Sequence, residues 1–325
     1  MKKIILVPSN LGLNPLGENH IPGTFKAPDV LMAHGLEKAF AGYEVVTMSQ
    51  PEYSPFPEPG TDILNGHKLR ELNIRIADEV SSAQNSGLKP IVIGGDCAIL
   101  PGALAGSRQL GPVALVHIDG HSDFRHPGNW NRKEAQKPAA AAGMDLALVT
   151  GRGEAILTSW PGIEGPLVPD RAVIQLGERE SLDEGYVWAD IFATDIERIT
   201  IFDALKLSDS EIITRIYRRL NDFPGWRYWV HIDMDVLDQS EISAVDSPGS
   251  PGLTSQSLTH IGHRLFENPR CCGITATIYD PDLDPSGQQA QLIARIISQI
   301  TMMVEFCRSG AIYRASSSHD EGKHA

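Results

Sequence analysis

The sequence is poor in cysteine and in positive charge, and each shortage excludes a class of protein. Only four cysteines occur in 325 residues, which is a poor framework for disulfides and is ordinary for a reducing cytosol. Lysine and arginine number 28 against 41 aspartate and glutamate residues, a formal charge of −13. Because this charge opposes binding to phosphate backbones and anionic lipids, we expect small-molecule partners, with no nucleic acid and no membrane.

Long apolar runs are also missing. The first residues read MKKIILVPSN, and their apolar run stops at Pro8, too early for the core of a signal peptide. No stretch approaches the ~20 apolar residues that a membrane helix needs. A cytoplasmic location is therefore expected.

Short apolar runs that alternate with longer amphipathic stretches are present instead, and this order is typical of βα units around a mostly parallel sheet. At 42% hydrophobic content the chain can bury a large core. No repeat or Gly/Ser linker divides it, so we expect one domain over residues 1–325, with a flexible, Ser-rich tail from about 315. Strands are expected at Lys3–Val7, Tyr43–Met48, Pro90–Ile93, Val113–Ile118, Ala172–Leu176, Tyr228–Ile232 and Gly273–Tyr279.

Two apolar series have helical spacing and are expected to be packing faces. They are Leu69, Leu72, Ile76, Val80 and Ala83, and Ile293, Ile296, Ile300, Met303 and Cys307. Ser208 followed by Glu211 predicts a capping box at the start of another helix. The polar loops 124–138 and 239–252 directly follow strand ends, which is where ligands bind in an open parallel sheet.

Three segments place metal-capable side chains just beyond an apolar strand: IVIGGDCAIL (91–100), VALVHIDGHSDF (113–124) and YWVHIDMDVLD (228–238). Asp96 in the first can simply cap a helix. In the second, Asp119, His121 and Asp123 occupy alternate positions, so an extended backbone would direct all three to one side. Asp233 and Asp235 repeat this spacing in the third. Four carboxylates at one sheet edge would repel one another, which implies a divalent metal and favours a pair.

These motifs resemble the metal signatures of the ureohydrolase family, which includes arginase, agmatinase and formimidoylglutamase. The matching motifs are GGD at 94–96, D-x-H-x-D at 119–123 and D-x-D-x-x-D at 233–238. Supporting matches are GTFKAPDVLMAHGL (23–36), AGMDLALVTG (142–151), IQLGERE (174–180), SPGSPGLT (247–254) and YDPDLDP (279–285). The resemblance implies a three-layer α/β/α sandwich with a mostly parallel sheet, assembly as trimers or hexamers, and two Mn²⁺ ions.

The resemblance also assigns roles at the metal site. Asp119 and Asp233 match carboxylates that bridge both ions, and His121 and Asp235 match ligands of one ion. The expected ligands are thus Cys97, Asp119, His121, Asp123, Asp233 and Asp235, with Cys97 and Asp123 at the other ion. Two cations that share a water generate a hydroxide able to attack a planar amidine or guanidine carbon. Asp123 is the expected catalytic residue, because it would orient the hydroxide and receive a proton.

Three positions depart from the family pattern. Cys97 stands in place of a metal-binding histidine, and a thiolate makes Zn²⁺ possible where the hard carboxylates favour Mn²⁺. Ala142 stands where the family has a proton-shuttling histidine, for which His126 in the nearby loop is a weak substitute. Ile278 stands where the family has an acid for the substrate's guanidinium, a charge that Asp280 could restore if the backbone is shifted.

The remaining polar candidates have ordinary structural interpretations. His117 and His231 each precede an aspartate ligand by two positions and are expected to be strand histidines satisfied by their neighbours. Asp238 is expected to organise a turn. Arg179 and Glu180 occupy the place of a substrate-contact loop, although a surface salt link explains them equally well. The adjacent cysteines 271 and 272 are expected to be core residues.

Three functional hypotheses follow. The first is a metal-dependent hydrolase of a linear C–N bond that uses a metal-activated hydroxide on a substrate other than arginine or agmatine, such as a formimidoylglutamate-like compound. The second is a catalytically impaired metal-binding relative with a structural or regulatory role, which the three departures favour. The third is a one-metal hydrolase that keeps only the ligands Asp119, His121, Asp233 and Asp235.

Overall fold

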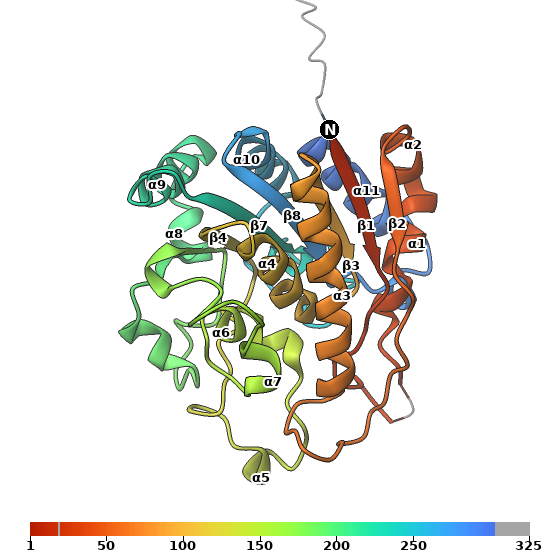
Figure 1. Cartoon of the computed structure of the whole chain (residues 1–325), viewed down its shortest axis with the longest axis vertical. Coiled ribbons are helices and arrows are strands. Elements are labelled where there is room, and N and C mark those ends of the chain that lie inside the picture. Colours follow the sequence, from red (N-terminus) through yellow and green to blue (C-terminus); the bar gives the residue numbers. More distant parts are fainter. Residues whose placement is uncertain (19, 303–325) are drawn as a thin grey trace, which may run out of the picture.

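The computed structural model describes residues 1–18 and 20–302, and its centre is one eight-stranded sheet in which neighbouring strands are parallel (Figure 1). The strand order is β2-β1-β3-β8-β7-β4-β5-β6. The strands are β1 (Lys2–Val7), β2 (Glu44–Thr47), β3 (Lys89–Gly94), β4 (Val113–Ile118), β5 (Val173–Leu176), β6 (Glu197–Ile199), β7 (Arg227–Asp233) and β8 (Cys271–Thr277).

Helices cover both faces of the sheet, which makes the fold a three-layer α/β/α sandwich (Figure 1). One layer contains α3 (Gly66–Asn85), α4 (Leu100–Arg108), α6 (Asp145–Val149) and α7 (Ala155–Thr158), which contact one another. The other contains α1 (Ala27–Leu31), α9 (Asp209–Asn221), α10 (Ser255–Glu267) and α11 (Gln288–Thr301). The short helices are α2 (Glu37–Ala39), α5 (Arg132–Ala135) and α8 (Ile201–Ala204).

The inner strands are apolar because each is buried from both sides. All six residues of β4, VALVHI, and all seven of β8, CCGITAT, are buried. Parallel strands between two helical layers have no solvent-facing side, so they appear in a sequence as near-continuous apolar runs. This property makes the central strands predictable from sequence.

Seven of the eight strands lie where the sequence predicts them, and two details of the prediction are wrong. Strand β6 was not expected, because its three residues Glu-Arg-Ile form a half-buried edge with no periodic signal. The last predicted strand runs too far: β8 ends at Thr277, since Ile278 has φ +77°, a left-handed conformation that ends an extended strand. Asp280 therefore does not share a strand face with Ile278.

The helical expectations are confirmed within the described residues. The predicted α3 face is buried from Leu69 to Ala83, and Ile293, Ile296 and Ile300 are buried on α11. Ser208 and Glu211 form the predicted capping box of α9. Met303, Cys307 and the tail from 315 lie outside the described residues. Within residues 1–18 and 20–302, no helix has the length and apolar character needed to span a membrane. The one-domain interpretation stays a prediction.

The polar motifs lie at the carboxyl ends of four strands that are adjacent in the order β3-β8-β7-β4. These strands are far apart in sequence, and the sheet brings their ends together. Ligands bind at this edge in open α/β sheets.

Candidate metal centre

Four aspartates and one histidine converge at the ends of β4 and β7. Ligand atoms of Asp119, Asp233 and Asp235 lie within 4.8 Å of one another, and so do those of Asp119, His121 and Asp123. Asp119 belongs to both groups, as a residue that contacts two ions would. We call these five residues the aspartate cluster. Each group has enough oxygen or nitrogen donors to hold a metal ion.

Backbone hydrogen bonds orient the carboxylates and leave part of each free. Asp119 Oδ1 accepts from the N–H of His121 at 2.6 Å, and Asp233 Oδ1 accepts from the N–H of Asp235 at 2.8 Å. Asp235 Oδ1 in turn accepts from the N–H of Gly120 at 3.1 Å, which ties the two loops together. Backbone N–H groups of the two loops therefore orient these three carboxylates.

The local reason for the convergence differs from the one predicted. An extended backbone from 119 to 123 was expected, but β4 ends at Ile118 and Asp123 has φ +45°. Asp235 likewise lies in a 3₁₀ turn, Met234–Val236, rather than on the strand. Tight turns after the strands bring the side chains together, and strand alternation does not.

The cluster carries more negative charge than a buried site accommodates. Burial, followed by the neighbouring carboxylates, raises the pKa of Asp119, Asp123 and Asp233 well above the usual value of 3.8. Burial also acts to raise the pKa of Asp235, but the pairing of its Oδ2 with His121 Nδ1 at 2.8 Å holds that pKa below 3.8.

One atom of the cluster is wholly unpaired. Asp119 Oδ2 is buried and has no hydrogen-bond partner within the part of the chain that the structure describes. Burying an ionised carboxylate without a partner is costly, so the group must be protonated or bind a cation. The donor set and this unpaired oxygen fit divalent metal ions.

Cys97 lies beside this cluster, at the start of a 3₁₀ turn (Cys97–Ile99) after β3. Asp96 caps that turn by accepting from the N–H of Ala98 at 3.0 Å, the structural role expected for it. The thiol of Cys97 donates to Asp233 Oδ2 at 2.8 Å. Burial, followed by the charge of Asp233, raises the pKa of this thiol well above 9.0, so without a metal it is protonated.

A cavity of about 390 Å³ opens onto the aspartate cluster. His121, Asp123, Asp233 and Asp235 line its floor, together with Ile278. Its walls come from residues 13–16, the loop 124–138, the segment 140–143 and residues 246–247. The two Gly- and Pro-rich loops predicted to border a ligand site therefore do border this cavity.

Two of the three departures from the family pattern line this cavity. Ala142 and Ile278 both line it, and neither can hold a proton or a charge. His126 does not line it, and its Nε2 pairs instead with Asp190 at 2.6 Å. Asp280 does not line it either, since its carboxylate accepts from the N–H of Gly23 at 2.8 Å. His126 and Asp280, which could have replaced the missing histidine and the missing acid, are therefore hydrogen-bonded to residues outside the cavity.

Sequence reasoning missed two cationic side chains of the cavity. Arg125 and Lys137 both line it, as do the acids Glu180 and Asp246. Burial lowers the pKa of Arg125, an effect that Asp123 opposes. The signal available in the sequence was the position of Arg125, two residues after Asp123.

The remaining candidates have structural contacts. Arg179 donates to the carbonyl oxygens of Pro251 and Asp235, so it braces the loop that follows β7 rather than forming a surface salt link. Asp238 accepts from the N–H groups of Ser240 at 3.0 Å and Gly252 at 3.1 Å and organises the turn, as expected. The adjacent cysteines 271 and 272 are buried in β8, as predicted.

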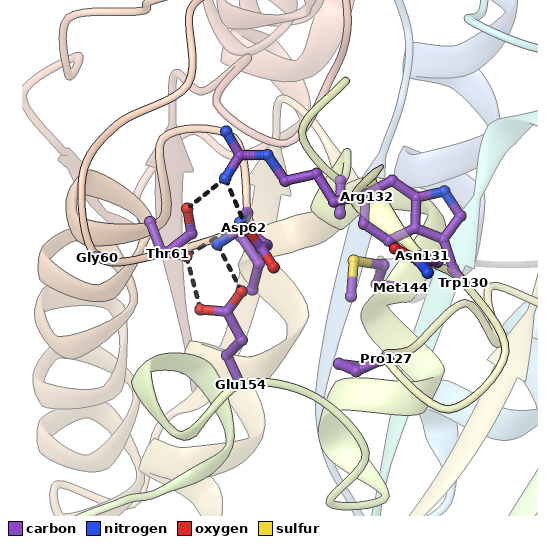
Figure 2. Close-up of a pocket in the computed structure, with 11 residues that line it drawn as sticks. Gly60, Thr61, Asp62, Pro127, Trp130, Asn131, Arg132, Met144 and Glu154 are labelled. Carbon is purple, nitrogen blue, oxygen red and sulfur yellow. Dashed lines mark hydrogen bonds and ion pairs between the residues drawn. The ribbon is translucent and has the colours of Figure 1, made fainter. Parts of the chain in front are cut away.

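A second cavity, of about 560 Å³, is lined by residues 60–63, residues of the segment 127–132, Ala139, Met144 and Glu154 (Figure 2). Its polar groups satisfy one another. Glu154 accepts from the Thr61 hydroxyl at 2.8 Å and from the N–H of Asp62 at 2.7 Å, and Arg132 donates to Asp62 at 2.6 Å (Figure 2).

Comparisons with known proteins agree with this geometry. The family model "Arginase family" matches residues 4–303. An arginase of Bacillus caldovelox is 29% identical over 236 residues, 71% of this chain and 75% of the relative. A formimidoylglutamase of Klebsiella pneumoniae subsp. pneumoniae is 21% identical over 244 residues, 74% of this chain and 70% of the relative. The solved structure of the Bacillus caldovelox arginase superposes with a TM-score of 0.78 at 24% identity, covering 92% of this chain and 98% of that one. The formimidoylglutamase of Bacillus subtilis gives a TM-score of 0.68 at 17% identity, covering 92% and 86%.

Proposed function

The chain belongs to the arginase family, and from this premise we propose that it is a metal-dependent hydrolase of a linear C–N bond in a small substrate. The observation that carries the proposal is the aspartate cluster. The pKa values of Asp119, Asp123 and Asp233 are raised, and the buried Asp119 Oδ2 lacks a partner within the described residues. A divalent cation satisfies both features at once. Oxygen-rich donors favour Mn²⁺ or Mg²⁺, and we propose Mn²⁺.

The residues around the cation site have separate chemical roles in the proposed reaction. When bound, a pair of divalent ions lowers the pKa of a shared water and stabilises the charge that develops during attack on a planar carbon. Asp123 faces both the cluster and the cavity, so it can orient the attacking water and accept its proton. His121 pairs with Asp235, which holds its imidazole in one orientation.

The cavity supports a substrate that bears a carboxylate. Ile278 supplies no acid for a guanidinium at its position, and Arg125 and Lys137 place two cationic side chains in the cavity beside the acids Glu180 and Asp246. A carboxylate paired with arginine forms strong, geometrically specific hydrogen bonds. We therefore propose a formimidoylglutamate-like amidine or amide in preference to arginine or agmatine. The similarity to formimidoylglutamases agrees with this substrate class.

The direct experiment is a comparison of substrates with Mn²⁺ supplied. Release of ammonia or formamide from formimidoylglutamate is measured beside release of urea from arginine, agmatine and guanidinobutyrate. We expect turnover only with the first compound or a related carboxylate-bearing amidine. Asp123→Asn should abolish that turnover while the protein keeps its fold.

A second candidate function is supported by Ala142 and by the engagement of His126 with Asp190. Without a proton shuttle at the cavity, the protein could bind metal and have a structural or regulatory role. Absence of hydrolysis of all four compounds by metal-loaded protein would favour this function. A one-metal hydrolase is distinguished by elemental analysis, which would then give one Mn²⁺ per chain. Assembly as a trimer or hexamer and a cytoplasmic location are further proposals by resemblance.

A further inference from the structure

A second group of metal-capable side chains lies beneath the aspartate cluster, deeper in the protein. His117 on β4 and His231 on β7 are direct register partners on neighbouring parallel strands, and their rings stack with centroids 5.1 Å apart. Asp145, the first residue of α6, lies against both rings. Together with Cys97 these residues form what we call the inner cluster, and all four are 0% exposed.

Two atoms of the inner cluster face each other without a hydrogen bond. Asp145 Oδ1 pairs with His117 Nε2 at 3.1 Å, but Asp145 Oδ2 and His231 Nε2, 3.3 Å apart, both lack a hydrogen-bond partner within the described part of the chain. The other nitrogen of His231, Nδ1, is held by the hydroxyl of Thr275 at 2.7 Å. Buried polar atoms are almost always paired, so two unpaired atoms that face each other indicate a missing bridging group.

We propose that Cys97, Asp145 and His231 bind a zinc ion at a site that adjoins the aspartate cluster but uses none of its residues. Their sulfur, oxygen and nitrogen atoms all lie within 4.8 Å of one another. Zn²⁺ binds sulfur at about 2.3 Å and nitrogen or oxygen at about 2.0–2.2 Å, so its ligand atoms stand roughly 3–4 Å apart. Small rotations of the three side chains bring their ligand atoms to this spacing, and a buried water is the fourth ligand of the tetrahedral ion.

The chemistry of the three ligands selects this metal. A thiolate is a soft ligand that favours Zn²⁺, whereas the oxygen donors of the aspartate cluster favour Mn²⁺. Binding requires the thiol to ionise, which removes its hydrogen bond to Asp233 and frees that carboxylate for the aspartate cluster. The hydroxyl of Thr277, 2.9 Å from the sulfur, can then donate to the thiolate.

Neighbouring groups are placed to orient the zinc ligands. Thr275 holds Nδ1 of His231 and leaves Nε2 directed at Asp145. His117 holds Oδ1 of Asp145 and leaves Oδ2 as the ligand atom. Such outer contacts are typical of protein metal sites. His117 is therefore a positioning residue in this proposal.

The zinc site has a structural role, because its complete burial leaves no access for substrate. It ties the turn after β3 to β7 and to α6, directly below the floor of the cavity. This assignment gives Cys97 to a different ion from the one that the family pattern implies. It rests on the geometry of the inner cluster and not on the proposed hydrolase activity.

Cobalt is the probe that tests the proposal, because a thiolate bound to Co²⁺ gives a charge-transfer band in the near ultraviolet. The buried ion is taken up as the chain folds, so the full-length protein is produced in minimal medium with Co²⁺ in place of Zn²⁺. We expect a thiolate-to-Co²⁺ band and one Co²⁺ per chain that survives removal of the more exposed ions by a mild chelator. Absence of the band in the wild-type protein overturns the proposal without any variant.

Variants then locate the ion. Asp145→Asn and His231→Gln should each reduce the retained Co²⁺ at least tenfold, as should Cys97→Ser, while Asp123→Asn, at the position that shares an ion with Cys97 in the family pattern, should keep the band. His117→Gln should weaken retention less than His231→Gln does. Circular dichroism shows which variants fold, and the folded ones are compared. A band that persists in His231→Gln or Asp145→Asn but disappears in Asp123→Asn would assign Cys97 to the aspartate cluster and contradict the proposal.

Discussion

The backbone N–H of Ile278 donates to the carbonyl oxygen of Gly95 at 2.7 Å. This bond joins the end of β8 to the turn after β3 and holds Ile278 at φ +77°, with its side chain on the floor of the cavity. The left-handed conformation is sterically strained for a β-branched residue, by roughly 1–2 kcal/mol. The surrounding structure therefore holds this apolar side chain at the position where a cationic substrate would need an acid.

Replacing Ile278 with an acid should shift the substrate preference toward guanidines. A guanidinium that is buried without a partner loses on the order of 1–3 kcal/mol, and each ~1.4 kcal/mol is a tenfold change in rate. Ile278→Glu should therefore raise kcat/KM for agmatine by roughly ten- to a hundredfold, measured as urea release. Ile278→Gln has the same shape without the charge and should leave the rate near that of the wild type. Wild-type turnover of arginine, agmatine or guanidinobutyrate at about 1 s⁻¹ or more would show that Ile278 does not determine specificity.

Metal content should distinguish Asp235 from Asp238, which lie three positions apart on one loop. Asp235 belongs to the aspartate cluster, whereas Asp238 is occupied with the N–H groups of Ser240 and Gly252. We expect Asp235→Asn to lower bound Mn²⁺ at least tenfold at limiting metal and Asp238→Asn to leave it unchanged, by elemental analysis after dialysis. Equal Mn²⁺ in the two variants would mean that the ligands on this loop are wrongly assigned.

Arg125 should contribute to substrate binding without contributing to metal binding. Arg125→Gln removes the charge that a substrate carboxylate would contact, which is expected to raise KM for formimidoylglutamate about tenfold or more with Mn²⁺ content unchanged. The matched control is Arg132→Gln, since Arg132 lines the second cavity and pairs with Asp62 (Figure 2). A similar KM in both variants would place the substrate carboxylate elsewhere.

The stability of the metal-free protein should fall as the pH rises. Burial, followed by repulsion from neighbouring carboxylates, raises the pKa of Asp119 and Asp123 well above 3.8, so above about pH 4 the folded state binds more protons than the unfolded chain. His121 adds to this trend between pH 6.5 and its own pKa of about 10, which its carboxylate neighbours raise against the effect of burial. Each group contributes up to about 1.4 kcal/mol per pH unit.

The measurement is the Tm of chelator-treated protein between about pH 5 and pH 8. We expect the Tm to decrease across this range, less steeply in Asp119→Asn, and the stabilisation by added Mn²⁺ to increase with pH because protons then compete less for the ligands. A metal-free wild type whose Tm stays level or rises across this range, or falls no more steeply than that of Asp119→Asn, would contradict the raised pKa values.

The sequence by itself determined the features that depend on short-range spacing. Burial on both faces makes the central strands visible as apolar runs, and the helical period marks the buried side of α3. The aspartate cluster was also predictable, because its members follow two of those strands within a few residues. The prediction that these side chains converge is confirmed, but the predicted cause, an extended backbone, is wrong, because turns after the strands bring them together. Strand β6 was missed because three residues at an edge carry no period.

Only the tertiary structure decided which distant residues meet. The inner cluster needs β4 beside β7, so that His117 and His231 are register partners, and it needs α6 to bring Asp145 over both rings. In the same way, His126 pairs with Asp190, and Asp280 accepts from the N–H of Gly23, so neither side chain lines the cavity. The periodicity of a sequence indicates which face of a helix or strand is buried. These contacts depend instead on the strand order β3-β8-β7-β4, in which neighbouring strands are separated by long stretches of chain. No local pattern in the sequence encodes that order.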